Sequence, residues 1–134
     1  IYGAFVAGLD AGFVHNHWPM MSEGKFMHET VLIEKTPLYK NFIEGKSGVQ
    51  FIHRILAFVV LISIIFIYLK GKMLAISKYQ INGLNLLMIL VGIQLLLGVL
   101  TILLQVPLWL GVSHQIGAFL LLASMTFTLH RFSK

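Results

Sequence analysis

Six histidines are the side chains of this 134-residue sequence best suited to metal ligation or proton transfer, and the sequence contains no cysteine. Neutral imidazole ligates iron, copper and zinc, and it carries protons near neutral pH. The lack of cysteine excludes disulfides, thiolate metal sites and cysteine nucleophiles within this chain. Only His53 and His114 fall well inside long apolar stretches; the others are His15, His17, His28 and His130. His53 and His114 therefore define the first candidate site.

The elements that must position these two histidines are membrane spans. Hydrophobic residues make up 57% of the chain and charged residues 11%, and the mean hydropathy is +0.86. A soluble domain carries about a quarter charged residues. No formal charge occurs in the 52 residues between Lys78 and Arg131, a stretch interrupted by Gln105, Pro107 and Gly111. The composition predicts an all-α integral membrane protein, with two spans joined by a tight turn in this stretch.

Charge and length together predict the boundaries of the elements. Residues 47–69, 81–104 and 108–129 are each long enough to cross a bilayer core, and residues 1–9 read as the end of a preceding transmembrane helix. The segment 10–46 holds all five acidic residues and reads as a polar loop. Because the sequence starts at Ile1 in apolar sequence, we expect a fragment: a four-helix transmembrane bundle, residues 1–134, whose first helix is truncated.

The lysines and arginines predict the orientation of the spans. Lys70, Lys72 and Lys78 crowd one connection, and Arg131 and Lys134 lie near the end of the sequence. Two spans separate these groups, so both lie on one face, which the positive-inside rule makes cytoplasmic. The loop 10–46 then faces outward. The excess of lysine and arginine over acidic residues therefore reflects this topology rather than nucleic-acid binding.

His53 and His114 are predicted to lie at one depth. Each is six residues past the predicted outer start of its span, about 9 Å into the helix. Small residues lie one turn from each histidine: Ala57 near His53, and Gly111, Gly117 and Ala118 near His114. Small neighbours leave slots beside the rings, which suits a porphyrin held between two helices by axial histidines.

The same residues permit other interpretations. An intramembrane histidine also serves as a proton relay or an interhelical hydrogen-bond donor, and membrane glycines such as Gly83, Gly92 and Gly98 commonly serve helix contact alone. Arg54 could bind a heme propionate, or it could extend to the lipid headgroups.

The remaining candidates are weaker. His15 and His17 form an H-x-H spacing that could bind a metal, but no third ligand is evident and loop histidines are mostly solvated. His130 lies beside Arg131, and we interpret it as a residue of the membrane–water interface, at a helix C-terminus that favours a cation. The thioethers of Met20, Met21 and Met27 suggest copper only weakly, since no cysteine accompanies them.

Taken in order, several motifs resemble those of heme A synthases, specifically their C-terminal half, in the alphaproteobacterial and mitochondrial type that lacks a loop cysteine pair. The similarity covers essentially the whole chain. The matching residues are Gly3 to Gly12, Asn16, Trp18-Pro19, Asn41 to Glu44, Val49 to Arg54 and Ser113-His114-Gln115. The chain departs from the family pattern at five positions, and both histidines of the candidate pair are unaltered. The five are His15, His17, Ile43, Gly45 and Ile52.

The resemblance implies an eight-helix enzyme of two related four-helix bundles that oxidises the C8 methyl of heme O to the formyl of heme A for cytochrome oxidase. It implies a heme b cofactor in this half, with His53 and His114 as axial iron ligands. Substrate heme O and the catalytic residues would belong to the other, N-terminal half, so this chain alone would be inactive. We also expect Asp10 and Trp18 to order the loop over the heme edge.

A bis-histidine heme has both axial positions filled, so we expect it to transfer electrons rather than bind oxygen. Alternatives are a non-catalytic b-type membrane cytochrome, and a transporter or channel subunit that uses both histidines as a proton pathway. Expected partners are membrane lipid, a heme O synthase, an electron donor and another copy of the chain. We expect the bacterial inner membrane, with loop 10–46 periplasmic and the C-terminus cytoplasmic.

Overall fold

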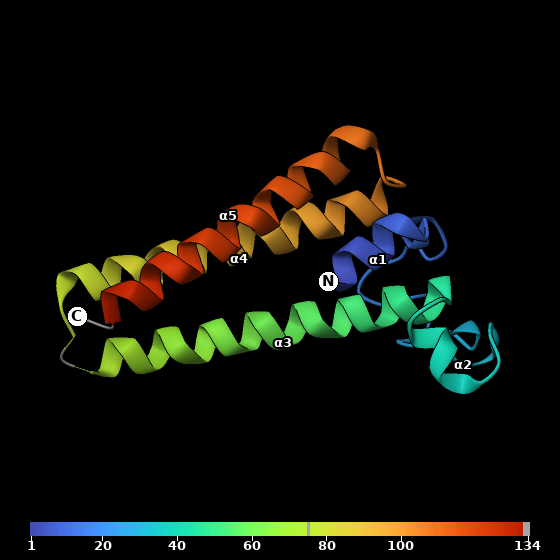
Figure 1. The fold of residues 1–134 in the computed structure, drawn as a ribbon, viewed down its shortest axis with the longest axis horizontal. Helices are drawn as coiled ribbons and strands as arrows, with labels where there is room; N and C mark the ends of the chain where they lie inside the picture. The colour runs from blue at the N-terminus through green and yellow to red at the C-terminus, as the bar shows by residue number, and fades with distance from the viewer. Residues whose placement is uncertain (75, 133–134) are drawn as a thin grey trace. The chain divides into compact units, whose positions relative to one another are not determined.

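The computed structural model describes residues 1–74 and 76–132, and they form helices joined by turns and loops. The α-helices are α1 (Tyr2–Gly8), α2 (Thr30–Ile33), α3 (Lys46–Met73), α4 (Lys78–Leu103) and α5 (Leu108–Phe132), and the 3-10 helices are Ala11–Phe13 and Leu38–Phe42 (Figure 1). Across these described ranges the only β pairing is an isolated bridge between Ser22 and Lys25. The predicted all-α class is therefore confirmed.

Three helices are long and apolar enough to cross a membrane: α3, α4 and α5, with mean hydropathies of 2.5, 2.7 and 1.4 over their most apolar windows. They match the three predicted spans in order. α3 and α4 also include the polar residues Lys46, Lys70 and Lys78, outside the predicted apolar ranges. Helical hydrogen bonding continues beyond the hydrocarbon core, and long lysine side chains reach the headgroups. Lys134, used above for orientation, lies outside the described residues.

The chain forms two compact units, which we describe separately. Unit 1 comprises Ile1–Ala57 and Val99–Leu108, and unit 2 comprises residues 58–98 together with residues from Trp109 onward. Unit 1 therefore contains α1, the long loop, the start of α3 and the turn after α4. Unit 2 contains the larger parts of α3, α4 and α5.

Within unit 1, one carboxylate and one carboxamide organise the entry into α3. Glu34 accepts hydrogen bonds from the backbone N–H groups of Lys46 (2.9 Å) and Ser47 (3.0 Å), which are otherwise unpaired donors of the first helical turn. Asn41 is fully buried and donates to three backbone carbonyls of the loop. A side chain at Gly48 would collide with the backbone carbonyl of Asn41, so the close approach of loop and helix requires glycine there.

The ends of α4 carry recognisable caps. At its start, the Ser77 N–H donates to the Gln80 side chain (3.0 Å) and the Gln80 N–H donates to Ser77 Oγ (3.3 Å), a capping box. At its end, the N–H groups of Gln105 and Val106 donate to the carbonyls of Ile102 and Thr101. This is a Schellman motif, with Gln105 at φ 60° in the left-handed position that glycine usually occupies.

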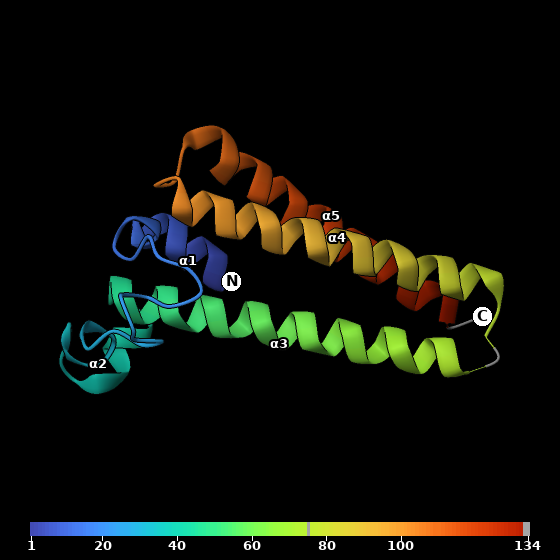
Figure 2. The same ribbon diagram turned by 180° about the vertical axis from the view of Figure 1, so that it is seen from behind.

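In unit 2, α4 and α5 lie side by side in both views (Figures 1 and 2). Thr128 donates a hydrogen bond to the Gly83 carbonyl (3.3 Å), and a Cβ at Gly83 would lie 3.1 Å from the Thr128 side chain. The predicted helix-contact role is therefore correct for Gly83. Gly92 makes no such contact among the described residues, where a Cβ would meet nothing within 4 Å, so its helix-contact role stays a prediction.

Candidate functional site

His53 lies in unit 1 near the beginning of α3, where it is half-buried. It is the eighth residue of that helix, about 10 Å along the helix axis. α1 passes beside it, since a Cβ built on Gly3 would lie 3.7 Å from the His53 Cε1 atom. That distance is an ordinary van der Waals contact, so the ring lies about one methyl group away from the α1 backbone.

His114 lies in unit 2, and it is the seventh residue of α5, about 9 Å along its axis. Its imidazole packs directly on Gly98 of α4. A Cβ at position 98 would lie 2.9 Å from Cε1 and 3.5 Å from both Nδ1 and Nε2. The ring therefore occupies the space that any side chain at position 98 would need. Gly98 therefore lies at a contact between α4 and α5, as predicted, and the side chain that it contacts is the candidate ligand His114.

Gln94, one turn before Gly98 on α4, fixes the backbone of the same histidine. Its Nε2 donates to the His114 carbonyl at 2.9 Å. Its Oε1 lies so close to Gly117 that no side chain fits there, which explains why the glycine occurs one turn after His114. Within the described part of the chain this buried Oε1 atom has no hydrogen-bond partner. Gln94 was not predicted as a site residue, although a carboxamide side chain inside an uncharged span is a signal that could have identified it.

Gly111 was also predicted to leave space beside His114. A Cβ there would meet nothing within 4 Å, so the surroundings of Gly111 are open. Gly98 and Gly117 instead accommodate the His114 ring and the Gln94 side chain. His53 and His114 belong to different units, and their pairing stays a prediction.

Arg54 is only 4% exposed and binds the outer loop. Its Nη2 donates to the His15 carbonyl (2.8 Å), and its Nη1 donates to the carbonyls of His17 (3.0 Å) and Met20 (3.2 Å). Its Nε is buried, with no hydrogen-bond partner among the described residues. The guanidinium is therefore buried against the loop carbonyls rather than exposed on the surface of the chain. Its predicted contact with a propionate stays a prediction.

His15 is 9% exposed, so the expectation that the loop histidines are solvated is wrong for this one. Its Nε2 lies 3.0 Å from Ser47 Oγ, and its ring centroid lies 4.8 Å from that of His28. Thr30 links His28 to Ser47. Its Oγ1 lies 2.8 Å from His28 Nδ1 and donates a hydrogen bond to Ser47 Oγ at 2.8 Å. This cluster was not predictable locally because Ser47 lies 32 residues from His15.

The other candidates are more peripheral. His17 is exposed in the loop, and His130 is exposed in the last turn of α5. Asp10 is exposed and has φ 54°, and its side chain does not cap the short helix that follows. Across the described ranges, no group of three or more His, Cys, Asp or Glu side chains could hold a metal ion.

The buried loop cluster predicts a pH dependence. Burial, followed by the charges of His28 and Arg54, lowers the pKa of His15 below 6.5, and His17 adds to this, whereas Glu34 acts in the opposite direction. Below about pH 6.5 the unfolded chain binds a proton before the folded chain does, so folded stability falls on acidification. We expect the thermal midpoint of the detergent-solubilised protein to drop by a few degrees between pH 7.5 and pH 5.5.

The drop should be much smaller in His15→Gln, and it should persist in His17→Gln, which removes an exposed imidazole from the same loop. Equal pH dependence in all three proteins would contradict the assignment. The Glu34 carboxylate should not contribute in this range. Although its partial burial acts to raise its pKa, hydrogen bonds from the backbone N–H groups of Ser47 and Lys46 lower that pKa below 4.5.

Comparison with known proteins identifies the family of the chain. Residues 1–126 match the model of the family described as cytochrome oxidase assembly protein. Proteins named heme A synthase from Flavobacterium johnsoniae and Flavobacterium psychrophilum are 58% and 59% identical over the whole chain, which covers 39% and 40% of their lengths. The heme A synthase of Wolbachia pipientis is 35% identical over 96% of the chain, which covers 34% of that protein. No solved structure matches.

The three apolar helices, with histidines set inside two of them, define an all-α integral membrane protein. The chain belongs to the cytochrome oxidase assembly protein family, because the family model matches nearly all of it. It spans about two fifths of the length of the Flavobacterium relatives.

Proposed function

We propose that this chain is the heme b-binding half of a heme A synthase, an oxidoreductase that converts the C8 methyl of heme O to the formyl of heme A for cytochrome oxidase. His53 and His114 would hold the heme b iron. The observation that carries the proposal is the His114 imidazole, held inside an apolar helix against a glycine that leaves room for nothing larger. The names of the Flavobacterium relatives support the reaction.

The residues present fit a bound heme. Neutral imidazoles are iron ligands, and each candidate histidine lies about 10 Å into a long apolar helix. Gly98 lets the His114 ring pack directly on α4, and Gly3 brings α1 close to His53 without a side chain between them. Gln94 holds the backbone of His114 by a hydrogen bond to its carbonyl. Ligand type, depth and small neighbours therefore agree.

When bound between two histidines, heme b supplies one-electron transfer. The chain's own residues position these histidines: each lies within a long apolar helix, and Arg54 binds the loop to the start of α3. A methyl carbon has neither an acidic proton nor a leaving group, so side chains alone cannot oxidise it. As the family resemblance implies, the catalytic residues and the heme O site would belong to the other half of the enzyme, and this chain alone would be inactive.

The proposal includes a location and partners. The protein lies in the bacterial inner membrane, with residues 10–46 periplasmic and the C-terminal end cytoplasmic, as the positive-inside rule favours. A heme O synthase supplies the substrate, and an electron donor reduces the heme.

The test is the reduced visible spectrum of the detergent-purified chain supplied with heme. We expect sharp low-spin b-type bands in the wild type, and their loss in His53→Ala and in His114→Ala. His130→Ala, which removes an exposed histidine from the same helix as His114, should keep them. Bands that persist in both ligand variants, or a folded wild type that binds no heme, would overturn the heme site.

The reaction needs its own test. The full-length protein should convert heme O to heme A, and His114→Ala should abolish the conversion. A full-length protein that binds heme but never converts heme O would instead be a b-type electron-transfer cytochrome.

A further inference from the structure

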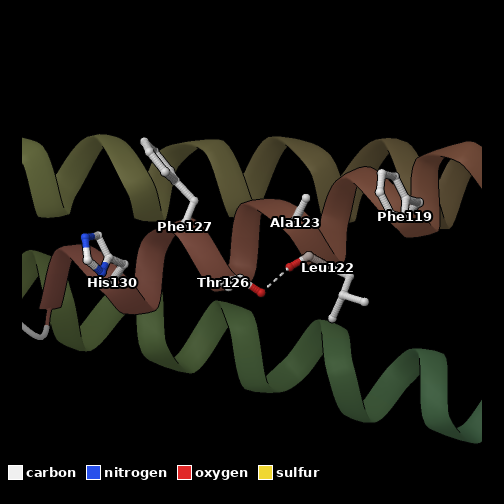
Figure 3. A pocket seen from close by; sticks show the side chains of 6 residues that line it. All are labelled: Phe119, Leu122, Ala123, Thr126, Phe127 and His130. Atoms are coloured by element: carbon white, nitrogen blue, oxygen red, sulfur yellow. Dashed lines mark hydrogen bonds between the residues drawn. The ribbon is translucent and has the colours of Figure 1, made fainter.

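The face of α5 near its C-terminal end carries an apolar groove that the proposed heme chemistry does not use. It has a volume of about 630 Å³ and is lined by Phe119, Leu122, Ala123, Thr126, Phe127 and His130 (Figure 3). Phe119 and Phe127 project on the same side of α5, with the small Ala123 between them. Thr126 donates its hydroxyl to the Leu122 carbonyl at 3.1 Å, so its polar group is already bonded within the helix. The groove is thus apolar along its length.

A second, more polar hollow of about 450 Å³ adjoins this groove. It shares Phe127 and His130 with the groove and adds Ser77, Tyr79, Gln80 and Arg131 from the facing ends of α4 and α5. The groove therefore passes from an apolar part into a polar, basic part at the ends of these membrane spans. A membrane phospholipid has the same order of chemistry, from acyl chain to phosphate.

Arg131 is held in place at this junction. Its Nη1 donates to the Tyr79 carbonyl at 2.7 Å, and its guanidinium lies 4.1 Å from the centre of the Phe127 ring. Gln80 in turn donates to the Arg131 carbonyl at 3.3 Å. A guanidinium carries five N–H donors, so one hydrogen bond to Tyr79 leaves donors for a bidentate contact with phosphate.

The charges of the chain favour an anionic occupant. Lys70, Lys72, Lys78 and Arg131 lie at the ends of α3, α4 and α5, whereas the sequence contains no Asp or Glu after Glu44. Arg131 therefore has no acidic side chain available in its own unit. On a cytoplasmic face, the anionic lipids of the leaflet supply the missing charge.

We propose that this end of unit 2 binds an anionic phospholipid, with the phosphate on Arg131 and an acyl chain in the groove over Ala123. The lipid would anchor the ends of α4 and α5, which the Arg131 contact with Tyr79 already joins. Neither the heme nor its ligands take part, so the site is independent of the proposed heme chemistry, and it rests only on the proposed cytoplasmic orientation of this end.

The test is lipid retention by the purified chain in nanodiscs that mix phosphatidylglycerol with phosphatidylcholine, followed by delipidation and native mass spectrometry. We expect preferential retention of phosphatidylglycerol. Arg131→Gln should lower that retention roughly tenfold, because it removes charge-assisted hydrogen bonds from the guanidinium to the phosphate. Ala123→Leu, which fills the groove without changing charge, should lower it as well. Lys72→Gln is the matched control because it removes an exposed cation outside both hollows.

Each contrary result has a defined meaning. Equal retention of the two lipids by the wild type would overturn the site, and so would an equal loss in Lys72→Gln and Arg131→Gln, which indicates unspecific attraction to the basic end. If Ala123→Leu dissociates a dimer without changing lipid retention, the groove is an interface between copies and the proposal fails.

Arg131→Lys keeps the charge and tests whether the loss in Arg131→Gln comes from misfolding. It should retain more phosphatidylglycerol than Arg131→Gln, and an equal loss in both variants would contradict the phosphate contact.

Discussion

Gly98→Ala should remove most of the low-spin heme from the purified chain. The added methyl would lie 2.9 Å from Cε1 of His114, so either the ring or the helix must move. Overpacking of this kind costs about 1–3 kcal/mol. If the cost falls on the ligand orientation, it corresponds to roughly a 5- to 150-fold loss of heme affinity. The measurement is a heme titration followed by the intensity of the reduced b-type bands.

Gly92→Ala is the matched control on the same helix. A Cβ there meets nothing within 4 Å, so heme affinity should stay at the wild-type value. Both substitutions replace glycine by a better helix former, which favours the helix by about 1 kcal/mol. A general loosening of α4 therefore cannot explain a loss seen only in Gly98→Ala. Equal heme affinity in the two variants would show that the Gly98 contact does not position the ligand.

The spans were predictable because their signal is local. Charges are expensive in a bilayer, so a 52-residue uncharged stretch interrupted by Gln105 and Pro107 already specifies two helices and a turn. The helix ends were less predictable, since α3 and α4 extend to lysines whose aliphatic stems tolerate the interface. The histidine positions along their helices follow from the same local count.

The contacts around the histidines were not predictable in the same way. Whether Gly92 or Gly98 faces His114 depends on how α4 and α5 are rotated about their axes, and the uniformly apolar α4 sequence gives little guidance on that rotation. The burial of His15 depends on contacts with Ser47 and Arg54, more than thirty residues away. Such long-range polar contacts have no periodic sequence signature.

Arg54 shows that a sequence can single out a residue without revealing its contacts. The sequence marks it as an unusual charge inside a span and offers propionate binding or the headgroups as partners. In the structure, the Arg54 guanidinium donates hydrogen bonds to three loop carbonyls, those of His15, His17 and Met20. A planar guanidinium can serve three acceptors at once, which the compact ammonium of lysine does poorly. The loop geometry therefore explains why arginine occurs at this position.

Arg54→Met should open the outer loop. Removing the guanidinium leaves three carbonyls without their donor, and an unsatisfied buried acceptor costs about 1–3 kcal/mol. A total of about 3 kcal/mol would raise the population of open loop roughly 100-fold. When opening and closing are fast, cleavage follows that population. Trypsin should therefore cut faster after the loop lysines Lys25 and Lys35, as measured by the rate of fragment appearance.

Arg54→Lys separates the two roles that this residue can play. If the loop contacts dominate, lysine should still leave the loop open to trypsin, because one ammonium cannot reach all three carbonyls. If a propionate is the main partner, lysine should keep the loop closed and weaken only heme binding. Lys72→Met removes an exposed cation from the other end of α3, and it should change neither the rate of cleavage by trypsin nor heme binding. Unchanged cleavage in both Arg54 variants would contradict the loop role, because buried carbonyls that lose their donor must cost stability in the folded loop.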